Sequence, residues 1–202
     1  MTTEERLRRY QALLLKWQQK INLISPATID TAWERHFEDS MQLADFLPHH
    51  AQTLFDLGSG AGFPGLVLAM MRPEVAVHLI EADHKKSSFL KAVSRDTNVP
   101  VQVYTERIEA VRIEAVPDVI TARALAPLQQ LFDYSAQWIA RNPDLVLILP
   151  KGEKVEDEIK AAQALWAFDC DCRRSQTDAR GSVLLCTRIR RLSPHVSRET
   201  CV

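Results

Sequence analysis

The sequence predicts an α/β fold with a mostly parallel seven-stranded sheet, a terminal antiparallel hairpin and helices ahead of the first strand. Three observations lead to this prediction. From residue 53 onward, short apolar runs alternate with segments of helical periodicity, as in consecutive βαβ units. A glycine-rich turn, Gly58 to Gly65, follows the first apolar run directly. The last two apolar runs are separated by a turn that is too short to hold a crossover helix.

The first 50 residues predict two helices that cover the sheet. Thr2 and Glu5 have the spacing of a capping box, and an apolar face follows over residues 7–21. A second apolar face runs from residue 33 to residue 44, and Pro48 ends that helix. We expect the two helices to cover one side of the sheet or to flank the mouth of its ligand site.

The remaining elements follow from the same alternation. Strands are expected at 53–57, 75–81, 101–104, 118–122, 144–149, 168–174 and 182–189. Helices are expected at 64–71, 85–96, 127–140 and 153–166. The chain is interpreted as a single domain over residues 1–202, with a helical cover at 1–50 and a poorly ordered polar tail at 192–202.

The junction between the first strand and its helix is the most informative stretch for function. Asp56-Leu57-Gly58-Ser59-Gly60 opens the turn, and Phe63-Pro64-Gly65 closes it. Glycines suit a backbone that must adopt positive φ angles and let a ligand approach closely. Glu81 ends the next strand, where a carboxylate can accept hydrogen bonds from both hydroxyls of a ribose. This combination predicts a nucleotide-like ligand at the carboxyl ends of the strands.

Two classes of cofactor fit this junction. Gly60-x-Gly62-x-x-Gly65 has the spacing of a dinucleotide fingerprint, so a dinucleotide-binding oxidoreductase is one alternative. A carboxylate at Asp56 would repel a pyrophosphate but would attract the ammonium and sulfonium groups of S-adenosyl-L-methionine. The terminal hairpin is also typical of the methyltransferase version of this fold. We therefore favour S-adenosyl-L-methionine, while a glycine-rich turn that binds nothing is the third interpretation.

Composition narrows the class of protein. The 202 residues carry a net charge of −1 and contain no apolar run long enough to span a membrane, and the N-terminus is charged, so we expect a cytoplasmic protein. The four cysteines have no C-x-x-C spacing, which favours free thiols and no metal site. From Arg173 onward there are seven arginines and two acidic residues. This basic edge either faces phosphates or is an ordinary solvated surface.

Several short segments occur in an order that matches one family. They are Asn22-Leu23-Ile24-Ser25, Arg35-His36-x-x-Asp39-Ser40, the Asp56–Gly65 turn, Arg72-Pro73-Glu74, Arg107-Ile108-Glu109, Ala122-Arg123-Ala124 and Pro150-Lys151-Gly152. Over about residues 10–190 the chain resembles the bacterial 16S ribosomal RNA guanine-N7 methyltransferases of the glucose-inhibited-division B family. The resemblance implies a Rossmann-like class I methyltransferase fold and S-adenosyl-L-methionine as cofactor. It also implies methylation of N7 of guanine 527 in 16S ribosomal RNA.

The resemblance further implies partners and residue roles. The partner would be 16S ribosomal RNA, the 30S subunit or an assembly intermediate of it, and the enzyme would act as a monomer without metal or membrane. The implied cofactor-binding residues are Gly58, Gly60, Phe63, Glu81, Ile108, Glu109 and Arg123. Arg123 and Lys151 are the implied catalytic residues, and Arg107, Lys151 and Arg180 are the implied RNA contacts. For the cations Arg123 and Lys151, a structural pairing with Asp39 or Glu109 is the alternative.

The chemistry of the target is consistent with these residues. Guanine N7 carries a lone pair and no proton, so attack on a sulfonium methyl group requires no general base. The segment after the fourth strand, Thr121-Ala122-Arg123-Ala124, lacks the Asp/Asn-Pro-Pro-Tyr sequence of amino-group methyltransferases, and no Pro-Cys is placed for attack on a pyrimidine. These absences disfavour adenine N6 and pyrimidine C5, whereas only the resemblance selects guanine N7. A non-catalytic RNA-binding module with the same fold is the alternative from another functional class.

Overall fold

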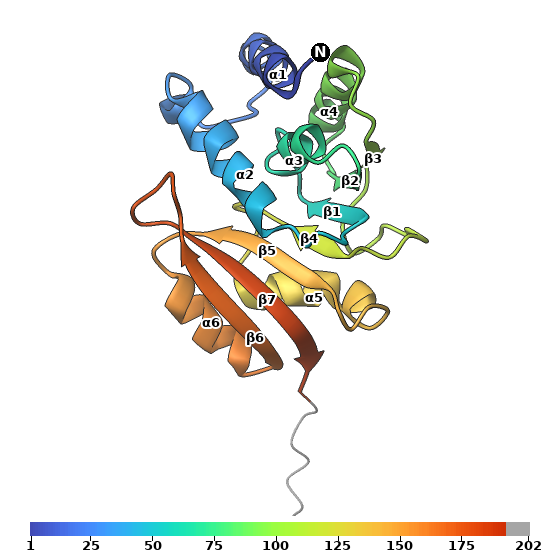
Figure 1. The fold of residues 1–202 in the computed structure, drawn as a ribbon, viewed down its shortest axis with the longest axis vertical. Coiled ribbons are helices and arrows are strands. Elements are labelled where there is room, and N and C mark those ends of the chain that lie inside the picture. The colour runs from blue at the N-terminus through green and yellow to red at the C-terminus, as the bar shows by residue number, and fades with distance from the viewer. Residues whose placement is uncertain (193–202) are drawn as a thin grey trace, which may run out of the picture.

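The computed structural model describes residues 1–192 and shows a seven-stranded sheet between two layers of helices (Figure 1). The strands are β1 Thr53–Leu57, β2 Ala76–Ile80, β3 Gln102–Tyr104, β4 Val119–Thr121, β5 Val146–Lys151, β6 Trp166–Arg174 and β7 Ser182–Arg191. Their order across the sheet is β3-β2-β1-β4-β5-β7-β6, and β7 alone runs antiparallel to both of its neighbours. The predicted parallel sheet with a terminal hairpin is confirmed. The tail predicted at 192–202 lies, except for Leu192, outside the described residues.

The helices follow the predicted alternation. They are α1 Thr3–Gln18, α2 Asp39–Met41, α3 Gly65–Met71, α4 His84–Thr97, α5 Leu128–Ile139 and α6 Val155–Gln163. The capping box of α1 forms as predicted, because Thr2 Oγ1 accepts from Glu5 N and Glu5 Oε2 accepts from Thr2 N. The helix predicted at 153–166 was too long at its end, since Trp166 already pairs with Arg191 in the sheet. In residues 1–192 no helix is long and apolar enough to cross a membrane.

The second predicted helix is a helical segment with three hydrogen-bond patterns. A π-helix at Trp33–Glu38 leads into α2, and a 3₁₀-helix at Gln42–Phe46 follows. A separate 3₁₀ turn at Pro26–Thr28 precedes this segment. π-Helical turns are rare and often occur at functional sites, because they change the direction in which side chains project. Here the segment directs polar side chains toward the carboxyl ends of the strands, as the next section describes.

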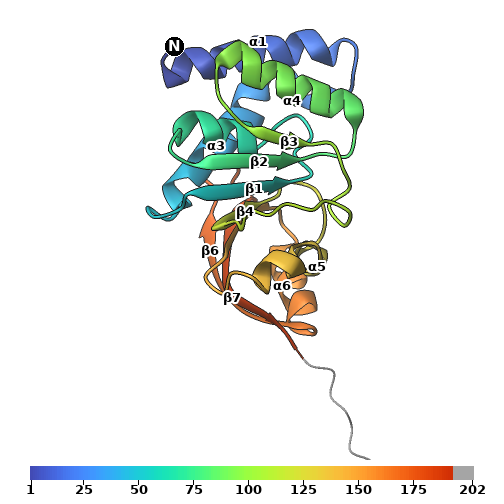
Figure 2. The same ribbon diagram turned by 90° about the vertical axis from the view of Figure 1, so that its right-hand side faces the viewer.

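Alternation along the strands divides the core into two apolar layers. On β1, Leu54 packs in the layer with α1, α3 and α4, whereas Phe55 and Leu57 pack in the layer with α5. Figure 2 shows α1 and α4 side by side and antiparallel on the first face. Contact between Trp17 of α1 and Phe89 of α4, with ring centroids 5.6 Å apart, is part of this packing. The N-terminal helices therefore cover one face, and the chain that follows α1 continues to the carboxyl ends of the strands.

Candidate active site

A cleft of about 1030 Å³ lies at the carboxyl ends of the parallel strands. Its wall contains nine residues predicted from the sequence, namely Gly58, Gly60, Phe63, Glu81, Arg107, Ile108, Glu109, Arg123 and Lys151. Arg180 is outside this wall, on the turn between β6 and β7, where its Nη1 lies 3.2 Å from Glu153 Oε1. The structure thus brings the predicted residues together with the exception of Arg180.

The glycine turn after β1 has two positions with different tasks. Gly58 and Gly60 have φ angles of 63° and 57°, in the left-handed region that favours glycine. A Cβ at Gly60 would meet only Gly58 O, at 3.8 Å, so the backbone at Gly60 is bare toward open space. A Cβ at Gly58 would lie 2.6 Å from Leu125 Cδ1. Gly60 therefore leaves room for a ligand, and Gly58 leaves room for Leu125.

Asp56 supports the glycine turn from beneath. Its side chain is fully buried, and its carboxylate accepts from Gly65 N at 3.3 Å and from Thr121 Oγ1 at 3.1 Å. Burial raises the pKa of Asp56 to about 6. The charge argument from the sequence placed this carboxylate toward the ligand. The structure places it outside the cleft wall, where it joins the turn to α3 and β4.

Glu81 stands at the end of β2 and faces the glycine turn. Its Oε2 accepts from Gly60 N at 2.7 Å, and its Oε1 accepts from Asp83 N at 2.8 Å. Asp83 in turn caps α4 by accepting from Lys85 N and Lys86 N. Each oxygen of an ionised carboxylate has a second lone pair. Glu81 is therefore fixed in orientation by backbone groups and can still accept from two hydroxyl groups of a ligand.

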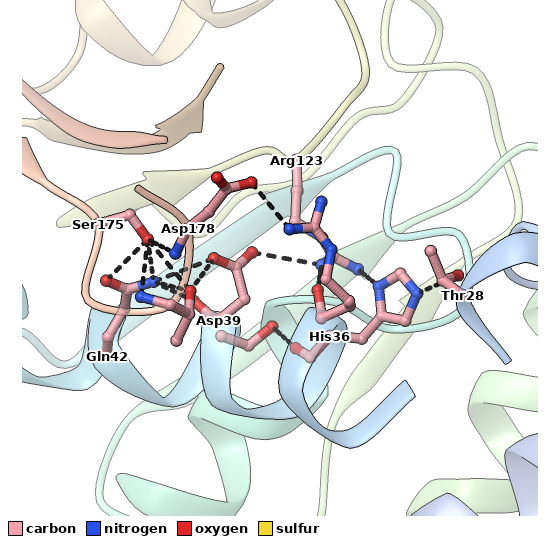
Figure 3. A network of polar contacts seen from close by, with 10 residues as sticks. Thr28, His36, Asp39, Gln42, Arg123, Ser175 and Asp178 are labelled. Carbon is pink, nitrogen blue, oxygen red and sulfur yellow. Dashed lines mark hydrogen bonds and ion pairs between the residues drawn. The ribbon is translucent and has the colours of Figure 1, made fainter. Parts of the chain in front are cut away.

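Arg123, just beyond β4, is held by acceptors from the helical segment over residues 33–46 (Figure 3). Its Nη1 donates to Arg35 O at 3.2 Å and lies 3.4 Å from Asp39 Oδ2, and its Nη2 donates to His36 Nδ1 at 3.0 Å. Burial and the charges of Arg123 and Arg35 lower the pKa of His36 to about 4, so the imidazole is neutral. Its Nε2 therefore donates to Thr28 Oγ1 at 2.9 Å. This chain of contacts fixes the guanidinium in the cleft wall.

Phe63 lies in an aromatic cluster beneath Arg123. Its ring stacks on the rings of Tyr10 and His36, in each case with centroids 5.3 Å apart, and the Arg123 guanidinium carbon lies 4.9 Å from its centroid. The Tyr10 hydroxyl donates to Ala61 O inside the glycine turn. The cluster therefore connects α1 to the turn. Tyr10 was predicted only as part of an apolar helix face, and its polar contact has no signal in that periodicity.

Lys151 occurs in a buried ion pair. Its Nζ lies 2.7 Å from Glu158 Oε2 and donates to Ala126 O at 3.1 Å, and 7% of its side chain is exposed. Glu158 Oε2 also accepts from Leu128 N, at the first residue of α5. The ammonium group that the sequence analysis assigned to catalysis and RNA is thus paired with a carboxylate, and it holds the loop between β4 and α5.

The loop after β3, residues 106–109, also forms part of the cleft wall. Ile108 is buried against the apolar layer that includes α5, whereas Arg107 and Glu109 are exposed. Arg107 O accepts from Ala110 N and Val111 N, each at 3.0 Å, which makes the loop compact. Within residues 1–192, no cluster of three or more His, Cys, Asp or Glu side chains could hold a metal ion.

A polar network joins the helical segment over residues 33–46 to the turn between β6 and β7 (Figure 3). Gln42 Nε2 lies 3.1 Å from Ser175 Oγ and 3.0 Å from Thr177 Oγ1, and Gln42 Oε1 accepts from Gln176 N at 2.9 Å. Arg35 Nη1 donates to Asp178 Oδ2 at 2.8 Å. These contacts were not predicted. Gln42 is not on the predicted apolar face of its helix, and its burial gave no signal in the sequence.

Comparison with known proteins identifies relatives over most of the chain. The family model described as rRNA small subunit methyltransferase G matches residues 3–180. The chain is 45% identical to the ribosomal RNA small subunit methyltransferase G of Rhodospirillum rubrum over 94% of this chain and 92% of that protein. It is 44% identical to the protein of the same description from Parvibaculum lavamentivorans, over 90% of this chain and 81% of the relative.

Solved structures with lower sequence identity share the fold. The ribosomal protein L11 methylase from Lactobacillus delbrueckii subsp. bulgaricus has a TM-score of 0.56 and 17% identity, and 77% of each chain is covered. The tRNA (uracil-54, C5)-methyltransferase of Pyrococcus abyssi, in complex with S-adenosyl-L-homocysteine, has a TM-score of 0.52 and 12% identity, over 73% of this chain and 36% of that chain. At these identities the likeness establishes the fold alone. The family match and the two relatives above 40% identity establish that this chain belongs to the rRNA small subunit methyltransferase G family.

Proposed function

We propose that this protein transfers a methyl group from S-adenosyl-L-methionine to N7 of guanine 527 in 16S ribosomal RNA. Members of this family are methyltransferases, and S-adenosyl-L-methionine is the cofactor. The observation that supports the assignment of the site is the convergence of Gly60, Glu81 and Arg123 on one cleft at the carboxyl ends of the strands. The target base and its position come from the resemblance described in the sequence analysis.

The residues of the cleft fit the cofactor. Gly60 presents a bare backbone toward open space, and Glu81 retains acceptor capacity for two ribose hydroxyls. Ile108 and Glu109 are the proposed edge of the adenine site, and Gly58 and Phe63 are proposed to lie along the methionine portion. Arg123 is a fixed cation at the opposite side of the glycine turn and is proposed to bind the cofactor carboxylate or the incoming nucleotide.

Methyl transfer to N7 requires alignment more than proton transfer. When bound, the cofactor supplies an electrophilic methyl group on a sulfonium. The protein must hold the purine nitrogen in line with that methyl group at near contact. The His36 side chain is neutral and uses both ring nitrogens for Arg123 and Thr28, which fits a positioning role and not that of a base.

The three proposed RNA contacts differ in whether a carboxylate already pairs with them in the structure. Arg107 is exposed in the cleft wall and is the most direct of the predicted contacts. Arg180 would exchange Glu153 for a phosphate. Lys151 is paired with Glu158 and is proposed to act through the loop that follows β4. The proposal also includes a cytoplasmic location, a monomer as the active form, and the 30S subunit or an assembly intermediate as substrate.

Transfer of radiolabelled methyl from S-adenosyl-L-methionine tests this function. The acceptors are 16S RNA and 30S particles that lack the modification, and the same acceptors with guanine 527 replaced by adenine serve as controls. We expect label in 7-methylguanosine at a single position on the unmodified acceptors and none on the replaced ones. Arg123→Ala, with its fold checked by circular dichroism, should transfer methyl at least about tenfold more slowly. Label in another nucleoside, or cofactor binding without any transfer, would contradict the proposal.

A further inference from the structure

The segment between β4 and α5, residues 122–127, is held near its start by an ion pair and at its end by hydrogen bonds to a second ion pair. At its start, Arg123 lies 3.4 Å from Asp39 Oδ2, with 17% and 20% of the two side chains exposed. At its end, Leu128 N donates to Glu158 Oε2 at 2.9 Å, and Lys151 Nζ lies 2.7 Å from the same oxygen. A short loop with both ends held in this way has little freedom to move.

The middle of this loop is strained and presents an apolar side chain. Ala124 has a φ angle of 53°, in the left-handed region that alanine rarely adopts. Strained backbone persists only where the surroundings determine it, and it concentrates at ligand sites. Leu125, the next residue, is 36% exposed, lines the cleft and packs over Gly58. A single exposed leucine is ordinary, but a leucine held in a cleft by strain and two clamps requires an explanation.

The strand order places Leu125 on the acceptor side of the cofactor. The sheet runs β2-β1-β4-β5 across the cleft. Glu81 follows β2 and the glycine turn follows β1, so the proposed ribose and methionine sites occupy that half. Leu125 follows β4, and beyond it the wall continues with Pro150 and Val183. Leu125 therefore lies where the proposed methionine site, at Gly58, meets the part of the cleft that the cofactor leaves open.

We propose that Leu125 is the surface against which the acceptor purine lies during methyl transfer, and that the Lys151–Glu158 pair is the clamp that holds it there. This inference rests on the proposed function. The face of a purine is apolar enough to pack against leucine methyl groups, and packing on one face sets the plane of the ring. A fixed plane aims N7 at the methyl group, which in-line displacement requires. Lys151 is then a positioning residue that acts through Ala126 and Glu158.

Three leucine variants test the contact with the base. Leu125→Ala removes the surface, Leu125→Met preserves an apolar side chain of similar volume, and Leu165→Ala truncates a leucine with 41% exposure in the connection between α6 and β6. Single-turnover methyl transfer and the Kd of S-adenosyl-L-methionine are measured for each. Loss of a packed base contact should slow Leu125→Ala about tenfold with its cofactor Kd within twofold of wild type. Leu125→Met and Leu165→Ala should stay within threefold of the wild-type rate.

A second pair of variants separates a clamp from a phosphate contact. Lys151→Gln and Glu158→Gln each break the ion pair, but only the first removes a cation. A clamp predicts that both slow methyl transfer to a similar extent and that neither changes the salt dependence of RNA binding. A phosphate contact predicts that Lys151→Gln reduces the slope of log K against log salt by about 0.7, while Glu158→Gln leaves RNA binding unchanged or tighter.

Each contrary result has a distinct meaning. Leu125→Ala at the wild-type rate, or with a cofactor Kd that rises in parallel with the loss of rate, would overturn the inference while the proposed function stands. Glu158→Gln at the wild-type rate would overturn the role of the clamp. Wild-type protein that modifies no RNA at all would overturn the proposed function and this inference together.

Discussion

At the scale of single residues, Asp56 supports the glycine turn from outside the cleft wall. The side chain is fully buried, and its two hydrogen bonds join the glycine turn, α3 and β4. Desolvation raises its pKa to about 6 from an ordinary value of 3.8, despite the hydrogen bonds from Thr121 and Gly65, which lower the pKa. At neutral pH this group therefore costs the fold about 3 kcal/mol relative to its protonated form.

The sign of this shift gives a stability prediction. Because the folded state binds the proton more tightly than the unfolded chain, the contribution of Asp56 to stability is greatest below about pH 4 and declines as the pH rises to about 6. Asp56→Asn, which keeps the shape of the side chain without its charge, should remove this decline. The free energy of unfolding of Asp56→Asn minus that of wild type should be about 2 kcal/mol larger at pH 8 than at pH 4.5. Urea unfolding at both pH values measures this difference.

Asp83→Asn is the matched control for that measurement. The pKa of Asp83 is lowered by the backbone N–H groups of Lys86 and Lys85, so its contribution to stability is lost as the pH falls. Its substitution should therefore cost more at pH 8 than near pH 3, which is the opposite direction. A difference between Asp56→Asn and wild type that does not vary with pH would contradict the assignment.

At the scale of elements, the helical segment over residues 33–46 and the turn between β6 and β7 form one structural unit at the cleft. Gln42 is 6% exposed and is the central member of the contacts between them. An amide nitrogen can donate only two hydrogens, so Nε2 is shared among the oxygens of Asp39, Ser175 and Thr177. Gln42 therefore holds this turn in place, although it lies 133 residues before Ser175 in the sequence.

Replacement of Gln42 tests this dependence. Gln42→Leu would leave the Gln176 N–H without its acceptor and would remove one partner from each hydroxyl of Ser175 and Thr177, which should reduce the free energy of unfolding by about 1–3 kcal/mol. Amide hydrogens of residues 175–181 should exchange faster, as measured by hydrogen–deuterium exchange and mass spectrometry. Gln163→Leu, at an exposed position at the end of α6, should change neither quantity. Unaltered protection of residues 175–181 in Gln42→Leu would show that the turn is held by other contacts.

At the scale of the whole molecule, the cations are distributed differently from what the sequence alone indicated. Four of the six described arginines of the basic C-terminal edge pair with carboxylates, as Arg173–Asp171, Arg180–Glu153, Arg188–Asp169 and Arg191–Asp133, whereas no ion pair among residues 1–192 includes Arg174 or Arg190. This arrangement favours the solvated-surface interpretation of that edge. By contrast, no ion pair among residues 1–192 includes Lys16, Lys20, Lys85 or Lys86.

These four lysines lie at one end of the molecule. Lys16 and Lys20 are at the end of α1, and Lys85 and Lys86 begin α4, which starts at the cleft and runs antiparallel beside α1 away from it (Figure 2). Cations in the first turn of a helix oppose the helix dipole, so Lys85 and Lys86 are not placed there for the stability of α4. Lys86 also lines the cleft. We expect this end to receive RNA phosphates.

The salt dependence of RNA binding distinguishes the two basic surfaces. Combined replacement of Lys16, Lys20, Lys85 and Lys86 by Gln should reduce the slope of log K against log salt by about 0.7 for each phosphate contact that is lost. Combined replacement of Arg173, Arg188 and Arg191 by Gln should reduce the slope less, because each of these arginines must give up a carboxylate partner before it can bind a phosphate. The opposite result would assign RNA to the C-terminal edge.

The sequence was sufficient for features that are local along the chain. The strands were predicted to within two residues at every end, because buried parallel strands are short apolar runs bounded by polar turns. The glycine turn and Glu81 were found because a tight turn and a strand end are local patterns. The partners of Gln42 and Lys151, and the position of Leu125 in the cleft, were not predicted. Each depends on which loops the sheet order brings together, and no periodicity in the sequence encodes that.

The position of β7 has a consequence for how the protein is made. Among residues 1–192, β7 is the last strand in sequence order, yet it lies between β5 and β6 and provides the only partner that β6 has in this part of the chain. During synthesis, the edge of β5 must stay unpaired until residues 182–191 have left the ribosome. An open strand edge is a template for pairing with other chains. A nascent chain that stalls or terminates before residue 182 would therefore leave a hydrophobic strand of the half-built sheet exposed, and such fragments should aggregate or be degraded instead of persisting as partial enzymes.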